Sequence, residues 1–326
     1  MPKILIKPEI SQKFLKNIVQ LIPILGQDNN KLLIAVSGGP DSLALMLLAQ
    51  HHFTGNVMAA TIDHQLRSEA AQEADYVAQI CSQIGMPHFI EKITVSRNAN
   101  IQSSARAERY KALHRIADAQ NGQWILTAHH ADDQLETMMM RLARGSGIDG
   151  LSGVRPQNGN IIRPLLNFTK DELQQICDDA AIAPIIDPSN QNVDFDRVRF
   201  RNWLSQPQTP INAISAAQSA HALQQANDAI SWSSDILWAQ HHAQSNDIIM
   251  LKNMEKLPHI YQRRLVLRAI SCIENDVKIR GEQLSMIIEN LLSMKKATIG
   301  DIIYYNKQSV WTFETAPKRA PRPQKN

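Results

Sequence analysis

The sequence is poor in cysteine, has no long apolar run and carries only a small excess of positive charge. Its three cysteines, Cys81, Cys177 and Cys272, are dispersed, with no Cys-x-x-Cys pair and no histidine spacing typical of a zinc site. We expect each to be a small buried side chain. The most apolar stretch, residues 43–48, is far too short to span a bilayer, and the first nine residues lack the apolar core of a signal peptide. These absences predict a cytoplasmic protein with no contact to a membrane.

A net charge of +3 does not identify a polyanionic partner by itself. Any contact with nucleic acid must therefore come from local clusters of Lys and Arg. The length of 326 residues is about twice that of a typical domain, so two domains are expected, although one oversized domain stays possible.

Short apolar runs alternate with helical patterns through the first half of the chain. Such alternation predicts an α/β fold with a parallel sheet flanked by helices on both faces. The expected strands are 32–36, 57–62, 89–95 and 124–127, and the expected helices are 43–48, 69–84, 103–119 and 132–144. Parallel sheets bind ligands at the carboxyl ends of their strands. The polar residues at those ends begin at Ser37, Asp63 and His129.

The second half of the chain has a different pattern. Residues 205–210, Ser-Gln-Pro-Gln-Thr-Pro, are hostile to a helix and predict a linker. We therefore expect an N-terminal catalytic domain at 1–205, a smaller and mainly helical C-terminal domain at 211–314 that contacts an RNA substrate, and a disordered basic tail at 315–326. Trp232 and Trp238 are six residues apart on an expected helix, a spacing that favours packing over stacking on bases.

A six-residue loop between the first strand and its helix is the strongest local signal. Paired glycines let the backbone approach a phosphate closely, and the following helix N-terminus offers free N–H groups. Asp41 is placed to hold a Mg²⁺ ion against the phosphates, and the absence of a Gly-x-x-x-x-Gly-Lys pattern disfavours a kinase or GTPase. The alternative is a helix cap with flexible glycines. The loop consists of Ser37, Gly38, Gly39, Pro40, Asp41 and Ser42.

This loop resembles the PP-loop of the ATP pyrophosphatases, which transfer AMP to a substrate and release pyrophosphate. Within that superfamily the chain resembles the tRNA(Ile)-lysidine synthetase family over most of residues 32–202, and only weakly after about Pro210. One departure is Ala70, where the family often has Ser. The matching segments are Asp63-His64-Gln65-Leu66-Arg67, Ala105-Arg106 with Arg109-Tyr110, 127–147 with Gly150-Leu151, Arg163-Pro164-Leu165-Leu166, and Asp187-Pro188-Ser189-Asn190 followed by Phe195, Arg197, Val198 and Arg199.

The resemblance implies an adenine nucleotide alpha hydrolase-like fold and an ATP-dependent ligase that forms a carbon–nitrogen bond. Its substrates would be free L-lysine and a tRNA(Ile) with a CAU anticodon. The wobble cytidine would be adenylated and then converted to lysidine, with release of AMP and pyrophosphate. ATP and Mg²⁺ are the expected cofactors. A monomer and a homodimer both stay open.

The resemblance also implies roles for His129, Asp133 and Glu136 in lysine positioning and amine activation. An amine with an ordinary pKa near 10.4 must lose a proton before it can attack, so a proton acceptor is needed. The alternative is that acidic residues here only stabilise a helix N-terminus. For His130 we leave both a role in catalysis or substrate binding and a purely structural role open.

Several arginines are candidates for phosphate recognition, on the nucleotide or on the anticodon backbone. Arg197, Arg199 and Arg201 alternate in a run that we expect to be extended, which would point them one way. The alternative is a solvated face with surface ion pairs. We predict that Asp63, His64 and Arg109 join the loop in nucleotide binding, and that the substrate is bound by Arg106, Arg144 and Arg199.

Two other functions compete with ligation. A tRNA-thiolating PP-loop enzyme would use the same adenylation but needs cysteines near the loop, and Cys81 and Cys177 are unpaired in the sequence. A nucleotide-binding module without catalysis is the second alternative. Pyrophosphate release separates it from an enzyme.

Overall fold

The computed structural model describes residues 6–22, 31–65, 70–94, 101–185, 196–206, 209–274, 277 and 279–317. The matching segments at 66–67 and 187–195 and the basic tail from residue 318 lie outside the described residues. Two compact units are present, Met1–Gln224 and Gln225–Asn326. The division falls inside helix α9, whereas the domain boundary near residues 205–211 stays a prediction.

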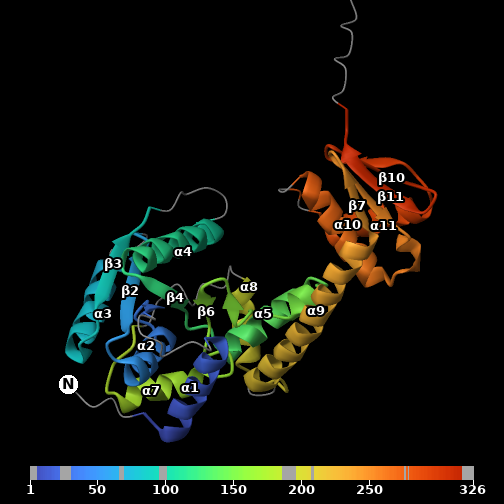
Figure 1. The fold of residues 1–326 in the computed structure, drawn as a ribbon. Helices are drawn as coiled ribbons and strands as arrows, with labels where there is room; N and C mark the ends of the chain where they lie inside the picture. The colour runs from blue at the N-terminus through green and yellow to red at the C-terminus, as the bar shows by residue number, and fades with distance from the viewer. Residues whose placement is uncertain are drawn as a thin grey trace, which may run out of the picture. The chain divides into compact units, whose positions relative to one another are not determined.

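The first unit contains a six-stranded sheet in the order β3-β2-β1-β4-β6-β5 (Figure 1). All neighbouring pairs are parallel except β5 with β6. The predicted parallel α/β fold is therefore confirmed. The strands are β1 (Lys31–Ala35), β2 (Val57–Asp63), β3 (His88–Lys92), β4 (Gly122–Leu126), β5 (Gln157–Asn158) and β6 (Ile161–Ile162).

Helices cover both faces of this sheet because its central strand is apolar on both sides. In β1, Leu32 and Ile34 join the core beneath α1, α2, α3 and α7, while Leu33 joins a second core beneath α4. Successive side chains of a strand point to opposite faces, so a continuous apolar run requires two covering layers. The helices are α1 (Pro8–Leu21), α2 (Pro40–Phe53), α3 (Ala70–Ile84), α4 (Ile101–Ala119), α5 (Ala131–Ala143), α6 (Ile148–Leu151), α7 (Lys170–Asp179) and α8 (Asp196–Leu204).

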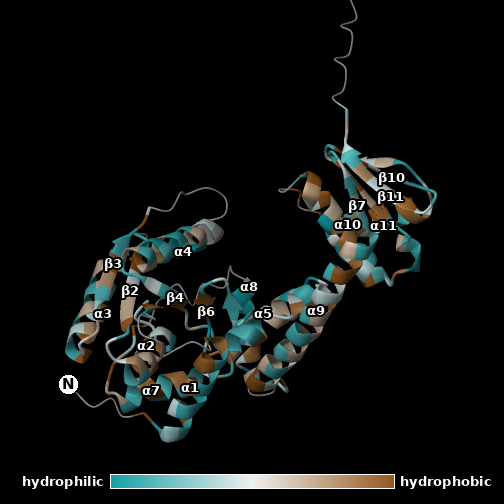
Figure 2. Cartoon of the chain, viewed as in Figure 1, coloured by the Kyte–Doolittle hydropathy of each residue, from teal (hydrophilic) through white to brown (hydrophobic). Residues whose placement is uncertain are grey.

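The second unit contains a five-stranded antiparallel sheet in the order β7-β8-β11-β10-β9. The prediction of a mainly helical C-terminal domain is therefore wrong. The strands are short, and their signal is alternation: in β10 the buried residues are Ile302, Tyr304 and Asn306. Hydrophilic and hydrophobic residues occur in the same helices (Figure 2). In this unit, the apolar residues of α10 and α11 pack in one core with Trp311 and Phe313 of the sheet. Helix α9 (Ala213–His241) contributes residues to both units. The other elements of the second unit are β7 (His242–Ser245), β8 (Ile248–Lys252), η2 (Met254–Lys256), α10 (His259–Ile273), α11 (Gly281–Leu292), β9 (Ala297–Ile299), β10 (Ile302–Lys307) and β11 (Val310–Thr315).

The burial predictions for single residues have mixed outcomes. Cys81 and Cys177 are buried as expected, but Cys272 is exposed. Trp238 is packed in the core of the second unit, whereas Trp232 is 68% exposed, so the packing prediction is wrong for Trp232. None of the helices in the described parts of the chain has the length and apolar character needed to cross a membrane.

Candidate active site

The loop at residues 37–42 joins β1 to α2 at the carboxyl edge of the sheet. Gly38 has φ +86°, and its carbonyl accepts a hydrogen bond from the Ile185 N–H at 2.9 Å. A Cβ atom on Gly38 would lie 2.6 Å from Cδ1 of Ile185. Both the backbone conformation and the packing therefore require glycine at position 38.

Gly39 is different, because neither its backbone conformation nor its packing against the described residues requires glycine. It is the N-cap of α2 with φ −74° and ψ 163°, which any residue can adopt. A Cβ atom there would meet only Ser37 Oγ, at 3.7 Å. Ser42 Oγ holds the loop in shape, accepting from the Ser37 N–H at 3.1 Å and donating to the Gly39 carbonyl at 3.0 Å. The loop thus keeps one face free of side chains beside the N-terminus of α2.

His130 connects this loop to the start of α5. Its buried imidazole places Nε2 3.5 Å from Asp41 Oδ2 and 3.6 Å from Asp133 Oδ2, and Nδ1 3.4 Å from Asp132 Oδ2. Burial lowers the pKa of His130, but the carboxylates of Asp132, Asp41 and Asp133 outweigh burial and raise it to about 10. His130 is therefore an imidazolium at neutral pH.

Asp41 fits the expected role as a Mg²⁺ ligand. Its Oδ1 atom is buried without a hydrogen-bond partner among the described residues. Mg²⁺ commonly binds through one carboxylate, nucleotide phosphates and water. The described part of the chain contains no group of three or more His, Cys, Asp or Glu side chains that could hold a metal. A Mg²⁺ ion here would accordingly be held by Asp41 together with phosphate oxygens.

His129 has the opposite charge state from its neighbour. Its Nδ1 lies 3.1 Å from Thr127 Oγ1 at the end of β4. Burial, followed by the charges of Arg163, Arg106 and Arg109, lowers the pKa of His129 well below 6.5. The imidazole is therefore neutral at pH 7 and has a lone pair available to accept a proton.

The two predicted carboxylates on α5 are ion-paired with arginines of α8. Arg197 pairs with Asp133, and its Nε is 2.5 Å from Glu136 Oε2, while Arg201 Nε is 2.6 Å from Glu136 Oε1. The expectation of an extended run is wrong, because residues 196–204 form a helix. Because Arg197 and Arg201 are four residues apart, they lie on the same face of α8. Arg199, which we predicted to bind the substrate, is exposed.

Another arginine cluster surrounds Tyr110 of α4. Arg106 NH2 lies 3.3 Å from Tyr110 Oη, and the guanidinium carbons of Arg106 and Arg109 lie 5.2 Å and 5.5 Å from the Tyr110 ring centroid. Arg163 follows β6 and is buried. Burial raises the pKa of Tyr110, but the charges of Arg106, Arg163 and Arg109 outweigh burial and lower it.

The remaining predicted residues have structural contacts of their own. Asp63 is buried at the end of β2, and its Oδ1 accepts from the Gln65 N–H at 2.8 Å. Burial and the nearby charge of Arg109 lower the pKa of His64. Arg144 is the exposed C-cap of α5. It lies about 18 Å along the helix axis from the acidic first turn, so the structure does not bring it to the loop.

Sequence reasoning missed the surroundings of three residues. Arg163 and Arg201 belong to runs that were recognised, but only the tertiary structure shows that the first is buried and that the second pairs with Glu136. Cys177 Sγ lies 3.4 Å from the Pro40 carbonyl, and burial raises its pKa to about 12. A thiol so protonated is a poor nucleophile, which counts against sulfur transfer.

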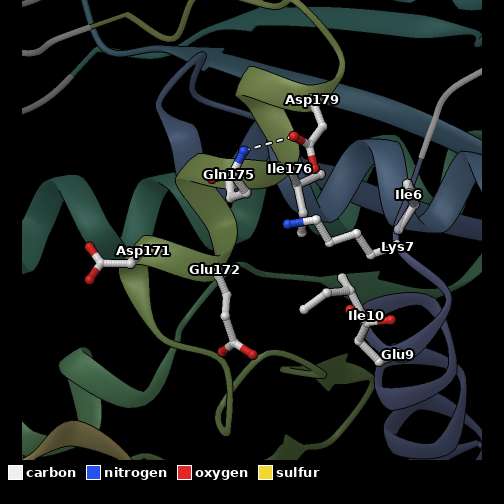
Figure 3. A pocket seen from close by; sticks show the side chains of 9 residues that line it. All are labelled: Ile6, Lys7, Glu9, Ile10, Asp171, Glu172, Gln175, Ile176 and Asp179. Carbon is white, nitrogen blue, oxygen red and sulfur yellow. Dashed lines mark hydrogen bonds between the residues drawn. The ribbon is translucent and has the colours of Figure 1, made fainter.

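A cavity of about 400 Å³ lies away from these residues, between α1 and α7 (Figure 3). Ile10 and Ile176 line it together with the carboxylates of Glu172 and Asp179. Glu172 already pairs with Lys13 at 2.7 Å, and Asp179 accepts from Gln175 Nε2 at 2.7 Å. None of the predicted site residues lines this cavity, so it is not the candidate active site.

Comparison with known proteins agrees with the loop geometry. Residues 7–208 match a family described as PP-loop domain. A tRNA(Ile)-lysidine synthase from Zymomonas mobilis is 42% identical over 301 residues, covering 89% of this chain and 90% of that protein. One from Novosphingobium aromaticivorans is 35% identical over 297 residues, with the same coverage of both chains. Among solved structures, a U34-tRNA thiolase from Methanococcus maripaludis has a TM-score of 0.54 and 19% identity, covering 67% of this chain and 78% of that one, which shows a shared fold alone.

Proposed function

The chain belongs to the tRNA(Ile)-lysidine synthase family of PP-loop proteins, and we propose that the carboxyl edge of its sheet carries out both chemical steps of that reaction. It is an ATP-dependent ligase. The substrates are ATP, lysine and tRNA(Ile), with the cytidine at the first anticodon position as the acceptor. The matched length supports transfer of the whole activity, because the alignment spans 90% of both relatives.

In the first step, the carbonyl oxygen of the cytosine ring attacks the α-phosphorus of ATP. The bond between the α- and β-phosphates breaks, pyrophosphate leaves, and the cytidine is adenylated. The loop supports this step because Gly39 and the first turn of α2 leave backbone N–H groups open to phosphate oxygens. A Mg²⁺ ion on Asp41 would neutralise charge on the leaving pyrophosphate.

In the second step, a lysine amine attacks the ring carbon that carries the adenylated oxygen. The new carbon–nitrogen bond forms, the carbon–oxygen bond breaks, and AMP leaves with that oxygen. The ammonium must first lose a proton, since its ordinary pKa is near 10.4. Neutral His129 can accept this proton, whereas His130 is already protonated among its three carboxylates.

Asp133 and Glu136 would bind the second positive charge of lysine or orient its amine. Both are engaged by Arg197, and Glu136 also by Arg201. A cationic substrate can therefore enter only by sharing or replacing an arginine partner. Glu136 is almost completely buried and pairs with both guanidinium groups, so it also holds α8 against α5.

The observation that carries the proposal is the meeting of an open phosphate loop and a neutral histidine at one sheet edge. The test is incubation of the protein with ATP, radiolabelled lysine and a tRNA(Ile) transcript with a CAU anticodon. We expect label in the RNA and equimolar release of AMP and pyrophosphate. The control transcript has uridine at the first anticodon position and should stay unlabelled. No label in the CAU transcript, with a folded preparation that binds ATP, would refute the assignment.

A further inference from the structure

Two buried glutamines from different helices hold the backbone of a single residue, Val154. Gln134 of α5 accepts from the Val154 N–H at 2.6 Å with Oε1 and donates to the Val154 carbonyl at 2.7 Å with Nε2. Gln224 of α9 donates from Nε2 to the same carbonyl at 3.1 Å and to the Ser152 carbonyl at 2.6 Å. Gln134 is 2% exposed and Gln224 is 5% exposed. The two are far apart in sequence, so the fold itself assembles this contact.

The turn between α6 and β5 makes room for the contact at Gly153. The φ of Gly153 is +66°, and a Cβ atom there would overlap Oε1 of Gln134. The same Cβ atom would lie 3.5 Å from the Cβ of Ala220 on α9. Glycine is therefore needed both for the left-handed backbone and for the close approach of α5 and α9 to this turn.

Helix α5 is held from two opposite sides as a result. Gln134 and Glu136 are two residues apart on this helix, which places them about 200° apart around its axis. On the side of Glu136, the partners are Arg197 and Arg201 of α8. A rotation of α5 about its axis would break the contacts on one side or the other. Together they fix the direction in which Asp133 leaves the first turn.

Apolar packing alone would fix this rotation less closely. A hydrogen bond depends on direction as well as distance, and a buried polar network with all partners in place selects one arrangement of the elements that it joins. An apolar side chain of the same length at position 224 would fill the same space. It would leave the Ser152 and Val154 carbonyls without this donor and would let the turn move against α9.

We propose that Gln134 and Gln224 are positioning residues, which act through the Val154 backbone to set the place of Asp133 and Glu136 for the lysine-transfer step. Gln134 acts directly, as a member of α5. Gln224 acts at one remove, from α9 through the turn at residues 152–154. The consequence for lysine rests on the proposed function, whereas the consequence for the position of α5 does not.

The test compares Gln224→Met with a matched control, Gln262→Met. Methionine is close to glutamine in length and is a good helix former, but its side chain has no hydrogen-bond donor. Gln262 lies in the second unit, is also 5% exposed, and donates from Nε2 to two backbone carbonyls, those of Met254 at 3.0 Å and Leu257 at 3.1 Å. The two variants should lose similar stability in urea, so a loss of stability cannot by itself explain a difference between them.

Amide hydrogen exchange of the full chain reports on α5 without any substrate. In Gln224→Met, residues 131–136 should exchange faster than in the wild type, whereas in Gln262→Met their exchange should be unchanged. Wild-type exchange of residues 131–136 in a folded Gln224→Met protein would overturn the proposal. This measurement decides the positioning role even if the wild type joins no lysine to RNA, a result that would count against the proposed function alone.

Steady-state kinetics tests the role in the reaction. Gln224→Met should raise the KM for lysine about tenfold with a smaller change in kcat, because the carboxylates that would bind lysine are displaced. Its ATP affinity, measured by calorimetry, should match the wild type, since the loop at residues 37–42 takes no part in the contact. A wild-type KM for lysine would overturn the proposal. An equal loss of ATP affinity, or an equal rise of the KM in Gln262→Met, would indicate general damage and would also overturn it.

A second variant covers the case in which Gln224→Met does not fold. Gln224→Asn keeps the amide but is one methylene group shorter, so it can reach the turn only if the turn moves toward α9. The exchange of residues 131–136 and the KM for lysine should then change in the same direction and by less. Wild-type values of both in a folded Gln224→Asn protein would overturn the proposal.

Discussion

Replacement of Gly39 by alanine separates the binding role of the loop from its folding. The backbone of Gly39 has φ −74° and ψ 163°, and among the described residues beyond its chain neighbours only Ser37 Oγ, at 3.7 Å, lies within 4 Å of an added Cβ. Alanine is therefore compatible with the folded state. Gly→Ala changes at compatible positions stabilise proteins by about 0.4–1 kcal/mol, because the unfolded chain loses freedom.

The same methyl group should weaken ATP binding. It would occupy space beside the N-terminus of α2 that Ser37 Oγ alone approaches among the described residues beyond its chain neighbours, and a phosphate bound by the loop would approach the backbone there. Loss of one hydrogen bond to a charged phosphate costs about 1.5–3 kcal/mol, or about tenfold to a hundredfold in Kd. We therefore expect unchanged or slightly higher stability together with a large loss in nucleotide affinity.

Urea unfolding and calorimetric ATP titration test both halves of this expectation. Gly38→Ala provides the contrast, because its φ of +86° and the 2.6 Å approach to Ile185 Cδ1 make alanine strained there. A left-handed residue with a side chain costs roughly 1–2 kcal/mol, so Gly38→Ala should lose stability as well as binding. Wild-type ATP affinity in a folded Gly39→Ala protein would refute the phosphate loop. A loss of stability in Gly39→Ala would refute the geometric argument.

Three further predictions concern the carboxylates and His129. Asp41→Ala should stay folded but lose pyrophosphate release in a coupled assay, and normal turnover would contradict its role toward Mg²⁺. Glu136→Gln should lower the free energy of unfolding, measured in urea, by about 1–3 kcal/mol. This is below the roughly 3–5 kcal/mol of a fully buried ion pair, because the two arginine partners of Glu136 are 39% and 37% exposed. The control Glu108→Gln, at a surface pair with Lys111, should change it by less than about 0.5 kcal/mol, and equal effects of the two variants would refute the argument. His129 has a folded-state pKa below 6.5, so the unfolded chain takes up its proton first and wild-type stability falls as pH drops through about 6.5. His129→Gln should lose less stability between pH 7.5 and pH 5, and an equal loss would contradict the neutral imidazole.

The sequence was sufficient to predict the parallel sheet. A run such as Leu32–Ile34 is apolar at every position, and only a strand covered on both faces buries all of it. The loop after this strand was predictable because its glycines, its proline and Asp41 each have a local conformational or chemical reason to be there. Local signals were enough where the structure depends on local conformation.

The failures have a common cause, which is that the decisive partner is distant in sequence. Nothing near Arg163 in the sequence indicates that it is buried, and nothing near Arg201 indicates that it pairs with Glu136. Arginines occupy positions 197, 199 and 201, a spacing that occurs in an extended strand as well as in a helix. We expected the strand, whereas the structure has a helix. In the second unit the strands span only three to six residues, too few to give a strong alternating signal.

The adjacent histidines show why residue type alone cannot assign chemistry. His129 and His130 have the same ordinary pKa, yet three carboxylates around His130 raise its pKa to about 10, while burial and arginines lower that of His129. Environments that push two like groups apart divide them into an acid and a base. Here the His130 imidazolium contacts the loop through Asp41, whereas His129 stays neutral because it is buried near the charges of Arg163, Arg106 and Arg109.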